Sequence, residues 1–442
     1  MDRIFIGENS IDAICGFMGS IMPGVNVLMV ADSTPIYRGA ENVKEKIYGL
    51  LSGRYMVKRL VLSGGGHDIR ADEAASRLIQ DSMGIADCVI GIGGGTITDL
   101  CKHAVYSSGK RVPLFIVQTV LSVNAFSDGV SVMLKQGVKR TAPTMFPTAL
   151  AIDLALVRQA PFERTLSGFG DLMATWTAPA DWFLSHKIGM NRNYHSAPYT
   201  ILAKQNYELL VNAGKLKEND GKTFETLARV LTLSGLAMGI AGESSPASGT
   251  EHLMVHLLDM AAESKNSEIA LHGAQVGAAS LLASIAWDIF LDTFEPSNID
   301  VDSCFPKEAD MKKKVYQAFA ALDAGGKAAD ECWNDYKKKL VTWRDNKDNF
   351  IRFLSAWPLF RKKVRTMVQK PEFLCECMQR AGAPTRFCQM GIDADTAKWA
   401  ITNCHLFRNR FTLADMLFYT GWWNDDFINR ITGRAHSMDA GL

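Results

Sequence analysis

Hydrophobic and polar residues follow two different patterns along this chain. Over residues 1–160, short apolar runs rich in β-branched residues alternate with longer stretches of helical spacing. That alternation is the pattern of βαβ units and a parallel sheet. From about residue 161 the apolar residues keep helical spacing over long stretches, such as 223–241 and 270–290, with few strand signals. We therefore expect an α/β domain over residues 1–160 and an all-α domain over residues 161–442.

Four apolar runs in the N-terminal domain are candidate strands. Each is soon followed by Gly, Ser, Thr or Asp, which suit a turn and the N-cap of a helix. These runs are residues 25–31, 57–62, 87–91 and 112–117. The run SGGG at residues 63–66 is interpreted as a turn only.

The composition excludes some classes of function. At 442 residues the chain is long enough for two domains, each with its own core. Charged residues make up 21% and the formal net charge is +1, so no overall field attracts nucleic acid or an anionic membrane. Two charged segments, 295–308 and 328–349, are predicted to be surface insertions whose charges form a solvated helix face.

Cysteine usage and the N-terminus indicate a cytoplasmic protein. The nine cysteines are scattered and form no C-x-x-C pair, as expected for reduced thiols in the cytosol. The first residues, MDRIFIGENSIDAI, include acids and lack the apolar run of a signal peptide. No segment reaches about 18 uncharged apolar residues, so we predict no membrane span.

A glycine-rich loop follows the third candidate strand. Residues 88–100 read CVIGIGGGTITDL, an apolar strand that runs into Gly93, Gly94 and Gly95 and then into a helix that begins near Thr96. Glycine lets backbone N–H groups approach a ligand closely, and a helix N-terminus carries partial positive charge, so a pyrophosphate fits there. Asp32 ends the first strand, where a carboxylate can accept hydrogen bonds from an adenosine ribose. The pattern predicts dinucleotide binding; the alternative is a tight turn with an N-capping Asp.

A carboxylate and two histidines form a candidate metal centre. Asp171 in GFGDLMATW, His252 in SGTEHLMVHLLDM and His272 in IALHGAQVG lie in segments that otherwise look buried. This ligand set suits zinc, nickel or iron(II), and three protein ligands leave a position open for water and substrate. His256 follows His252 by four residues and shares its helix face. Taken singly, each histidine could instead be a core or surface residue with satisfied hydrogen bonds.

Together these segments resemble the superfamily of metal-dependent polyol dehydrogenases, glycerol-1-phosphate dehydrogenases and dehydroquinate synthases, and most closely its glycerol-1-phosphate dehydrogenase branch. The resemblance spans residues from about 60 to 280. The matching stretches are GIGGGTITDLCK at 91–102, QTVLSVNAFSDG at 118–129, GFGDLMATWTAPADW at 168–182, SPASGTEHLMVHLLD at 245–259 and LHGAQVG at 271–277.

The resemblance implies a fold and a set of site residues. The fold is a Rossmann-like dinucleotide-binding domain and a helical metal- and substrate-binding domain, with the active site in the cleft between them and a homodimeric assembly. The cofactor's pyrophosphate is expected on residues 95–99. The implied roles are cofactor binding for Thr96, Asp99, Thr119, Ser122 and Asp128, metal binding for Asp171, His252 and His272, and substrate contact for His256.

Four positions depart from the family's pattern. Iron-type alcohol dehydrogenases place a fourth ligand histidine at the position of Thr175, so the resemblance favours zinc or nickel over iron. Asn124 stands where the family has a substrate-contacting Asp, which keeps hydrogen bonding but removes a charge. Gln118 replaces a proline. Ser245 replaces an arginine, so one anion-binding group is missing.

The resemblance implies a metal-dependent, NAD(P)H-linked reduction of a small ketone, with dihydroxyacetone phosphate to sn-glycerol 1-phosphate as the first hypothesis. Asp171, His256 and Asn124 are the candidate catalytic residues. Asp32 favours NAD over NADP, because a carboxylate repels a 2′-phosphate. Three alternatives stay open: a dehydroquinate-synthase-like cyclase, a polyol or alcohol dehydrogenase with another substrate, and a binding protein without catalysis.

Overall fold

The computed structural model describes residues 1–442 except 2, 23, 65–68, 136–137 and 323–324. Part of the SGGG run at 63–66 therefore lies outside the described residues. The chain divides into two compact units, of which the first contains Met1–Phe169 and Asn212–Gly239, and the second contains Gly170–Val211 and Ile240–Leu442. The sequence predicts a single boundary near residue 160. In the structure each unit consists of two segments of the chain, and their first boundary lies between Phe169 and Gly170.

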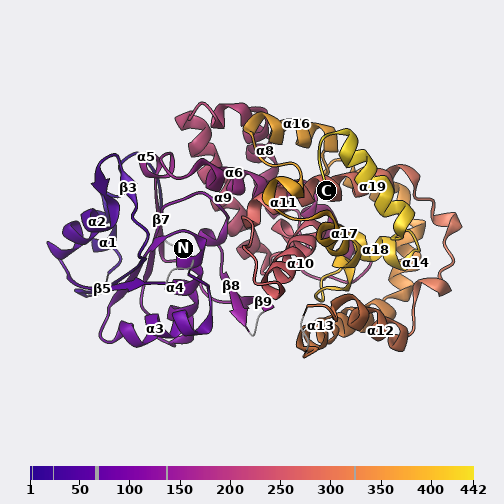
Figure 1. The fold of residues 1–442 in the computed structure, drawn as a ribbon, viewed down its shortest axis with the longest axis horizontal. Helices are drawn as coiled ribbons and strands as arrows, with labels where there is room; N and C mark the ends of the chain where they lie inside the picture. The colour runs from indigo at the N-terminus through magenta and orange to yellow at the C-terminus, as the bar shows by residue number, and fades with distance from the viewer. Residues whose placement is uncertain (2, 23, 65–68, 136–137, 323–324) are drawn as a thin grey trace. The chain divides into compact units, whose positions relative to one another are not determined.

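A six-stranded parallel sheet forms the centre of the first unit (Figure 1). Its strand order is β1-β10-β7-β6-β2-β5. The strands are β1 (Arg3–Gly7), β2 (Asn26–Asp32), β5 (Met56–Leu62), β6 (Cys88–Gly93), β7 (Leu114–Gln118) and β10 (Ala149–Asp153). The four candidate strands correspond to β2, β5, β6 and β7, and the expected parallel α/β architecture is confirmed.

The sequence analysis did not identify the remaining strands. β1 and β10 pair with each other at one side of the sheet, and two short antiparallel pairs lie outside it. These pairs join β3 (Tyr37–Arg38) to β4 (Glu41–Asn42) and β8 (Val130–Lys135) to β9 (Val138–Pro143).

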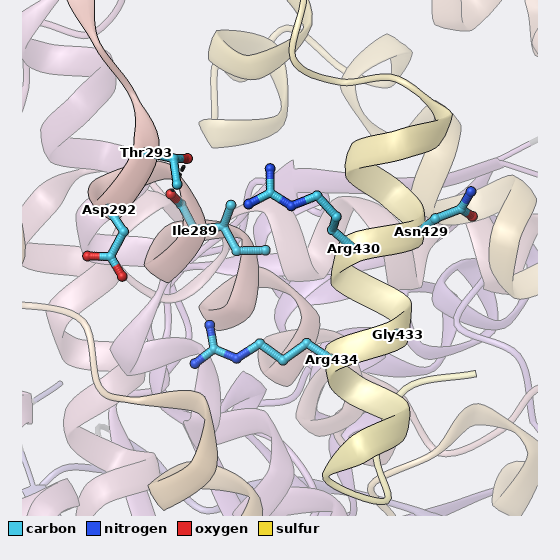
Figure 2. A pocket seen from close by; sticks show the side chains of 7 residues that line it. All are labelled: Ile289, Asp292, Thr293, Asn429, Arg430, Gly433 and Arg434. Atoms are coloured by element: carbon cyan, nitrogen blue, oxygen red, sulfur yellow. Dashed lines mark hydrogen bonds between the residues drawn. The ribbon is translucent and has the colours of Figure 1, made fainter.

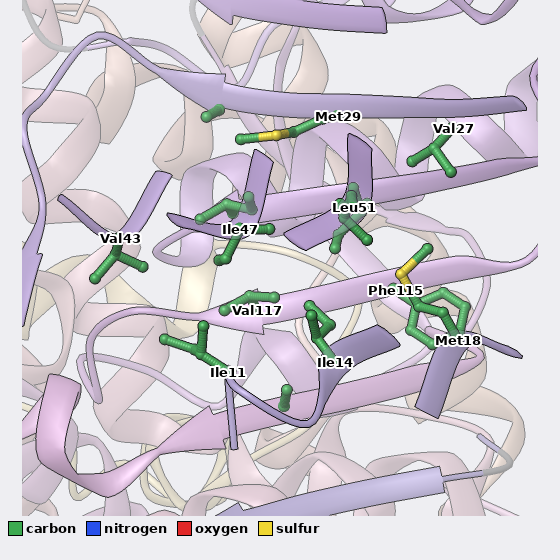
Figure 3. Packing of buried hydrophobic residues seen from close by; sticks show 14 of the residues in the cluster. Ile11, Ile14, Met18, Val27, Met29, Val43, Ile47, Leu51, Phe115 and Val117 are labelled. Carbon is green, nitrogen blue, oxygen red and sulfur yellow. The ribbon is translucent and has the colours of Figure 1, made fainter. Parts of the chain in front are cut away.

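Side chains at every second position of the strands build the core under the sheet (Figure 3). In a strand, residues two apart point to the same face. Val27, Met29 and Ala31 of β2 therefore share one face, on which helices α1 and α2 lie. Helix α2 contributes Ile47 and Leu51, which are four residues apart and fully buried.

The helices of the first unit cover this sheet or extend from it. They are α1 (Ile14–Gly19), α2 (Val43–Ser52), α3 (Glu73–Met83), α4 (Gly95–Ser107), α5 (Leu154–Val157), most of α6 (Phe162–Asp171) and α9 (Gly221–Ala241), and the 3-10 helices η1 (Ala125–Ser127) and η3 (Ala213–Leu216).

The strand order places a topological switch point between β2 and β6. From β2 the chain crosses to β5 on one side, whereas from β6 it crosses to β7 on the other. In open parallel sheets, ligands bind outside the carboxyl ends of the strands at such a point. Asp32 ends β2, and the loop Gly93–Gly95 follows β6, so both lie at this point.

The second unit is helical, as expected. Its longer helices are α7 (Ala178–Lys187), α8 (Ala197–Val211), α10 (Thr250–Ser264), α11 (His272–Thr293), α12 (Glu308–Phe319), α13 (Lys327–Asp345), α14 (Lys347–Ser355), α15 (Trp357–Val364), α16 (Pro371–Ala381), α17 (Ala394–Asn403), α18 (Leu413–Tyr419) and α19 (Asp425–Ser437). Its 3-10 helices are η2 (Leu172–Trp176), η4 (Ser245–Ala247), η5 (Pro296–Asn298), η6 (Asp302–Cys304), η7 (Phe387–Met390) and η8 (Cys404–Leu406).

Two helices, α9 and α11, are long and apolar enough to cross a membrane by length and composition. In α11 the apolar segment is 100% buried inside the protein, and in α9 the buried share is 61%. A helix that is apolar on all sides is typical of the core of a large soluble protein. Both helices are therefore assigned to the core of the protein.

The prediction that residues 328–349 form a surface insertion is wrong for one face of α13. Trp333, Tyr336 and Trp343 of this helix are buried, and so is Lys339. Their spacing follows the helical period, so α13 is amphipathic and contributes a full row of side chains to the core. Only its opposite face is solvated.

A surface groove of about 520 Å³ lies between the end of α11 and helix α19 (Figure 2). The groove is lined by Ile289, Asp292, Thr293, Asn429, Arg430, Gly433 and Arg434. None of the residues predicted to be catalytic, cofactor-binding or metal-binding is among them. The candidate site is therefore built elsewhere in the molecule.

Candidate active site

The glycine loop connects strand β6 directly to helix α4. Gly93 ends β6, Gly94 is the N-cap of α4 and Gly95 is its first residue. A Cβ atom on Gly93 would lie 2.6 Å from Ile97 Cγ1, and one on Gly95 would lie 2.9 Å from Val123 Cγ2. Glycine is thus required for packing at these two positions.

The first turn of α4 has no side-chain cap. Gly94 provides no side-chain cap, and Thr96 in this turn is exposed. A helix begins with N–H groups that have no partner within the helix, and its dipole favours an anion there. The start of α4 can therefore bind a phosphate group.

Thr119 lies beside this loop. Its backbone N–H donates to the carbonyl oxygen of Gly93 at 3.1 Å, because β7 pairs with β6 and Gln118 lies opposite Gly93. Gln118 accepts a hydrogen bond from Thr98 of α4 at 3.3 Å and donates to the carbonyl oxygen of Val120 at 2.8 Å. The predicted cofactor residues Gly93, Thr96 and Thr119 are thus brought together.

Two predicted cofactor residues, Asp99 and Asp128, instead face a buried lysine. Lys102 Nζ lies 3.2 Å from Asp99 Oδ1 and 2.5 Å from Asp128 Oδ1. Burial raises the pKa of Asp99 to about 6, although Lys102 opposes that shift. In this structure the two carboxylates neutralise Lys102 and fix α4 to the segment that leads into β8.

Asp32 is paired with Lys44. The Lys44 ammonium donates to the Asp32 carboxylate, to the Asp32 carbonyl oxygen at 2.6 Å and to the carbonyl oxygen of Thr34 at 2.5 Å. Both side chains keep some exposure, 24% for Asp32 and 12% for Lys44. The negative charge predicted at the end of β2 is therefore partly neutralised.

Ser122 and Asn124 follow Thr119 in the same loop. The carbonyl oxygen of Ser122 accepts a hydrogen bond from the Ser167 hydroxyl at 3.0 Å, and Asn124 donates to the Ser234 hydroxyl at 3.0 Å. These bonds hold the loop in place. The roles predicted for the two side chains stay predictions.

Asp171 and His272 are neighbours because of a close backbone contact. A Cβ on Gly170 would lie 2.3 Å from the carbonyl oxygen of Gly273, so only glycine fits at that position. Asp171 ends α6, and His272 begins α11. The contact between Gly170 and Gly273 therefore brings together two residues that are about one hundred positions apart.

Helix α10 supplies the other two side chains of the cluster. His252 lies in its first turn and His256 one turn later. The His252 Nε2 atom is 3.5 Å from Asp171 Oδ1, and the His252 and His272 ring centroids are 5.4 Å apart. His256 lies 5.6 Å from His272 by ring centroids. All four predicted residues thus gather at one place in the second unit.

Buried carboxylates lie behind both histidine ligands. Glu251 Oε1 is 3.0 Å from His252 Nδ1, and the same carboxylate accepts hydrogen bonds from Gly249 N at 2.5 Å and Thr177 Oγ1 at 2.8 Å. Asp259 Oδ2 is 3.7 Å from His272 Nδ1. Each carboxylate turns the Nε2 atom of its histidine toward the cluster, which is the usual arrangement behind a metal-binding histidine.

The cluster attracts positive charge. Burial alone would lower the pKa of His252, but the carboxylates of Asp171 and Glu251 outweigh it and raise the pKa to about 9. A cation at this position is thus strongly favoured, and it can be a proton or a metal ion.

The donor set fits one divalent metal ion. Asp171, His252 and His272 each offer a ligand atom, and these atoms lie within 4.8 Å of one another. A single ion with bonds of about 2.1 Å needs its ligands no more than roughly 4.2 Å apart, so shifts of under about 1 Å are enough. Thr175, which the family resemblance aligns with a fourth ligand histidine, is buried.

Sequence reasoning missed several residues of this region. Glu251 and Asp259 were detectable, since Glu251 precedes His252 directly and Asp259 lies seven positions after His252 on the same helix face. Phe407, whose ring centroid is 6.1 Å from that of His256, and Arg410, which contacts Ser248, come from the C-terminal region. Neither residue carries a local signal for such a contact.

The chain is similar in sequence to known dehydrogenases. A sequence profile described as iron-containing alcohol dehydrogenase matches residues 5–161. The glycerol-1-phosphate dehydrogenase [NAD(P)+] of Halalkalibacterium halodurans is 30% identical over 295 residues, which cover 64% of this chain and 70% of that protein. The enzyme of the same name from Bacillus licheniformis is 25% identical over 425 residues, covering 93% of this chain and 87% of that protein.

Solved structures share the fold. Glycerol dehydrogenase from Schizosaccharomyces pombe matches with a TM-score of 0.60 at 13% identity, over 98% of this chain and 91% of that one. A sulfoacetaldehyde reductase from Bifidobacterium kashiwanohense in complex with NAD+ matches with a TM-score of 0.56 at 14% identity, over 95% of this chain and 96% of that one. At these identities the likeness is one of fold.

Proposed function

The chain belongs to the glycerol-1-phosphate dehydrogenase branch of the iron-containing alcohol dehydrogenase superfamily, and we therefore propose that it reduces dihydroxyacetone phosphate to sn-glycerol 1-phosphate. It is an NAD(P)-dependent, metal-containing dehydrogenase. What we propose beyond this enzyme class is the substrate, dihydroxyacetone phosphate. The relatives named above are glycerol-1-phosphate dehydrogenases by name, which supports this choice.

One observation carries the proposal. Asp171, His252 and His272 meet in a buried cluster with Glu251 and Asp259 behind the two imidazoles. A protein that only bound a nucleotide would have no need for a metal centre with an open position.

In the proposed reaction a hydride and a proton are added across the ketone C=O bond. When bound, the metal supplies Lewis-acid polarisation of the ketone oxygen, and NAD(P)H supplies the hydride. The start of α4 holds the cofactor's pyrophosphate, and Asp171, His252 and His272 hold the metal. His256, buried against His272 and Phe407, delivers the proton to the alcohol oxygen.

We further propose zinc or nickel as the metal and NAD as the preferred cofactor. The structure groups three possible ligands, and the family resemblance places Thr175 where iron-type members have a fourth histidine, so zinc or nickel suits the site better than iron. Asp32 at the end of β2 supports NAD. A cytoplasmic location and a homodimeric state complete the proposal.

The test is a steady-state assay of NADH oxidation by protein that has been stripped of metal and reloaded with zinc or nickel. Dihydroxyacetone phosphate is the substrate, and the metal-free protein is the control. Turnover that requires both the metal and this ketone supports the proposal. NADH binding without net oxidation would point instead to a cyclase that regenerates its cofactor, or to another ketone.

The His272→Ala variant tests the metal centre directly. Removing one of three ligands should abolish both tight zinc binding and turnover, because the remaining pair is too weak a site. Zinc content after dialysis and NADH oxidation are measured side by side. His195→Ala, in the same helical unit but outside the cluster, is the matched control. Full activity in His272→Ala would remove this residue from the metal centre.

A further inference from the structure

Arg410 is a charged side chain that the proposed chemistry does not yet use. It lies in the segment between η8 and α18, more than one hundred and fifty positions after the residues it contacts. Its Nη1 atom donates to the carbonyl oxygen of Ser248 and to the Ser248 hydroxyl at 2.6 Å, and its Nη2 atom donates to the Ser244 hydroxyl at 2.6 Å. All of these acceptors are neutral.

The guanidinium has no carboxylate partner within ion-pair distance among the described residues. Burial lowers the pKa of Arg410, while Glu243, Glu251 and Asp181 act on it only from a distance and oppose the shift. Removing a cation from water is costly unless an anion accompanies it. Arg410 is half-buried, so its guanidinium lies against two serines and a carbonyl group while part of it stays accessible to a ligand. Its contacts provide no anion to balance its charge.

The nearby carboxylates are committed to other groups. Asp181 accepts from Thr250 N at 2.7 Å and from Leu413 N at 3.0 Å, and so occupies the start of α10. Glu243 accepts hydrogen bonds from Trp182 at 2.9 Å and Ser245 at 2.9 Å. Neither carboxylate can serve as the missing partner without leaving its own donors unsatisfied.

Arg410 lies close to the metal cluster. Ser248 directly precedes the N-cap Gly249 of α10, and His252 follows within the first turn of that helix. Phe407, three residues before Arg410, places its ring centroid 6.1 Å from that of His256. Between them, Arg408 has a backbone φ of 60°, a strained conformation for a residue other than glycine, and such strain is concentrated at functional positions.

We infer that Arg410 binds the phosphate group of the substrate at the metal site. A guanidinium has five N–H groups, and the bonds to Ser244 and Ser248 use three of them. The Nε–H and one Nη2–H are left, and two parallel N–H groups match two oxygens of a phosphate monoester. This inference rests on the proposed function, since it specifies which part of the phosphorylated ketone is recognised.

The test compares zinc-loaded wild type with Arg410→Met. The variant should raise KM for dihydroxyacetone phosphate by about tenfold or more, because a charge-assisted pair of hydrogen bonds is lost. Its zinc affinity and its KM for uncharged dihydroxyacetone should stay within about twofold of wild type. Arg430→Met, which removes the same charge from the groove beside α19, is the control and should change neither.

A purely structural role gives a different result. If Arg410 only held Ser244 and Ser248, the variant would affect zinc affinity and both substrates alike, which overturns the inference. An unchanged KM for the phosphorylated substrate overturns it as well. Should Arg410→Met fail to fold, Arg410→Lys keeps a positive charge without the paired geometry, and an intermediate KM for the phosphorylated substrate alone is expected.

Failure of the proposed function is distinguishable from failure of this inference. If wild type does not turn over dihydroxyacetone phosphate, calorimetry with inorganic phosphate and zinc-loaded protein decides the matter. Binding that wild type shows and Arg410→Met loses supports the role of Arg410. Equal binding by both proteins, or none by wild type, overturns it.

Discussion

Glu251 and Asp259 show how much of the candidate site depends on residues that would not touch the metal. Glu251 is fully buried and holds three donors at once: His252 Nδ1, Gly249 N and Thr177 Oγ1. Asp259 accepts from Gln275 at 2.9 Å while facing His272 Nδ1 at 3.7 Å. Such carboxylates fix the tautomer of the histidine and increase its basicity.

Glu251→Gln is therefore expected to weaken zinc binding by about 10- to 100-fold while the fold is retained. The neutral amide has the same shape but no longer stabilises the Nδ1–H tautomer of His252. Zinc affinity is measured by competition with a chelator. Glu225→Gln, in an exposed pair with Arg229, serves as the control. Equal zinc affinity in both variants would show that Glu251 does not position His252.

The pairing of Asp32 with Lys44 predicts how the cofactor preference can be changed. Lys44→Met leaves the Asp32 carboxylate without its cation, so repulsion of a 2′-phosphate increases. We expect the Kd for NADPH to rise by about tenfold and that for NADH to change by less than about threefold. Lys46→Met, which removes a cation paired with Asp12 and Glu41, is the matched control. Fluorescence titration with both nucleotides gives the two Kd values, and equal weakening of both would contradict this reasoning.

At the scale of elements, the start of α4 lies at the switch point of the sheet, which is where ligands bind in open parallel sheets. Strands β2 and β6 lie side by side, yet their connections leave in opposite directions, which leaves the start of α4 uncovered by a crossover. The buried triad of Lys102, Asp99 and Asp128 then anchors the far side of the same helix. The helix is thus fixed by its own unit, and its first turn has no side-chain cap, as the proposed binding of a pyrophosphate requires.

The Thr96→Asp variant separates two effects of the α4 start: stabilisation of the helix by a negative charge and binding of the cofactor's pyrophosphate. A carboxylate in the first turn should keep or slightly raise the unfolding temperature, because it favours the helix dipole. The same charge should weaken NADH binding by about tenfold or more through repulsion of the pyrophosphate. Thr96→Asn is the neutral control. If NADH bound equally well to Thr96→Asp, the pyrophosphate would have to lie elsewhere.

At the scale of the whole molecule, the metal ligands all come from the helical unit, so metal loading should stabilise that unit. Ligand binding stabilises a folded protein by about 2.7 kcal/mol when the free metal is at 100 times its Kd. The cluster joins α6, α10 and α11, which are far apart in the sequence. Chelation should therefore lower the unfolding temperature.

The stability of the metal-free protein should also depend on pH. The pKa of His252 is raised to about 9 from an ordinary 6.5, because Asp171 and Glu251 outweigh the opposing effect of burial. The folded protein binds the His252 proton more tightly than the unfolded chain does. The contribution of His252 to the free energy of unfolding is therefore complete below about pH 6.5 and is lost as the pH rises through about 9. Calorimetric unfolding across that range should show a fall for metal-free protein and a smaller one for zinc-loaded protein. The same slope in both forms would contradict this assignment.

The sequence by itself determined the local features of this protein. The strands β2, β5, β6 and β7, the glycine loop after β6 and the helical C-terminal part follow from patterns that span a few to twenty residues. Periodicity and turn chemistry act over such lengths, which is why these predictions are possible. The strands β1 and β10 and the buried face of α13 carry the same kind of signal less clearly. The set of Asp171, His252 and His272 follows from short motifs together with the family resemblance, and the structure brings the three residues together.

Only the tertiary structure decided which charges meet. Lys44 neutralises Asp32, Lys102 holds Asp99 and Asp128, and Arg410 reaches back to the start of α10. The pairing of Arg410 with Ser244 spans 166 positions, and no local pattern encodes such a contact. It depends on how the helices pack, because the free energy of pairing buried charges is determined by their surroundings and not by their place in the sequence.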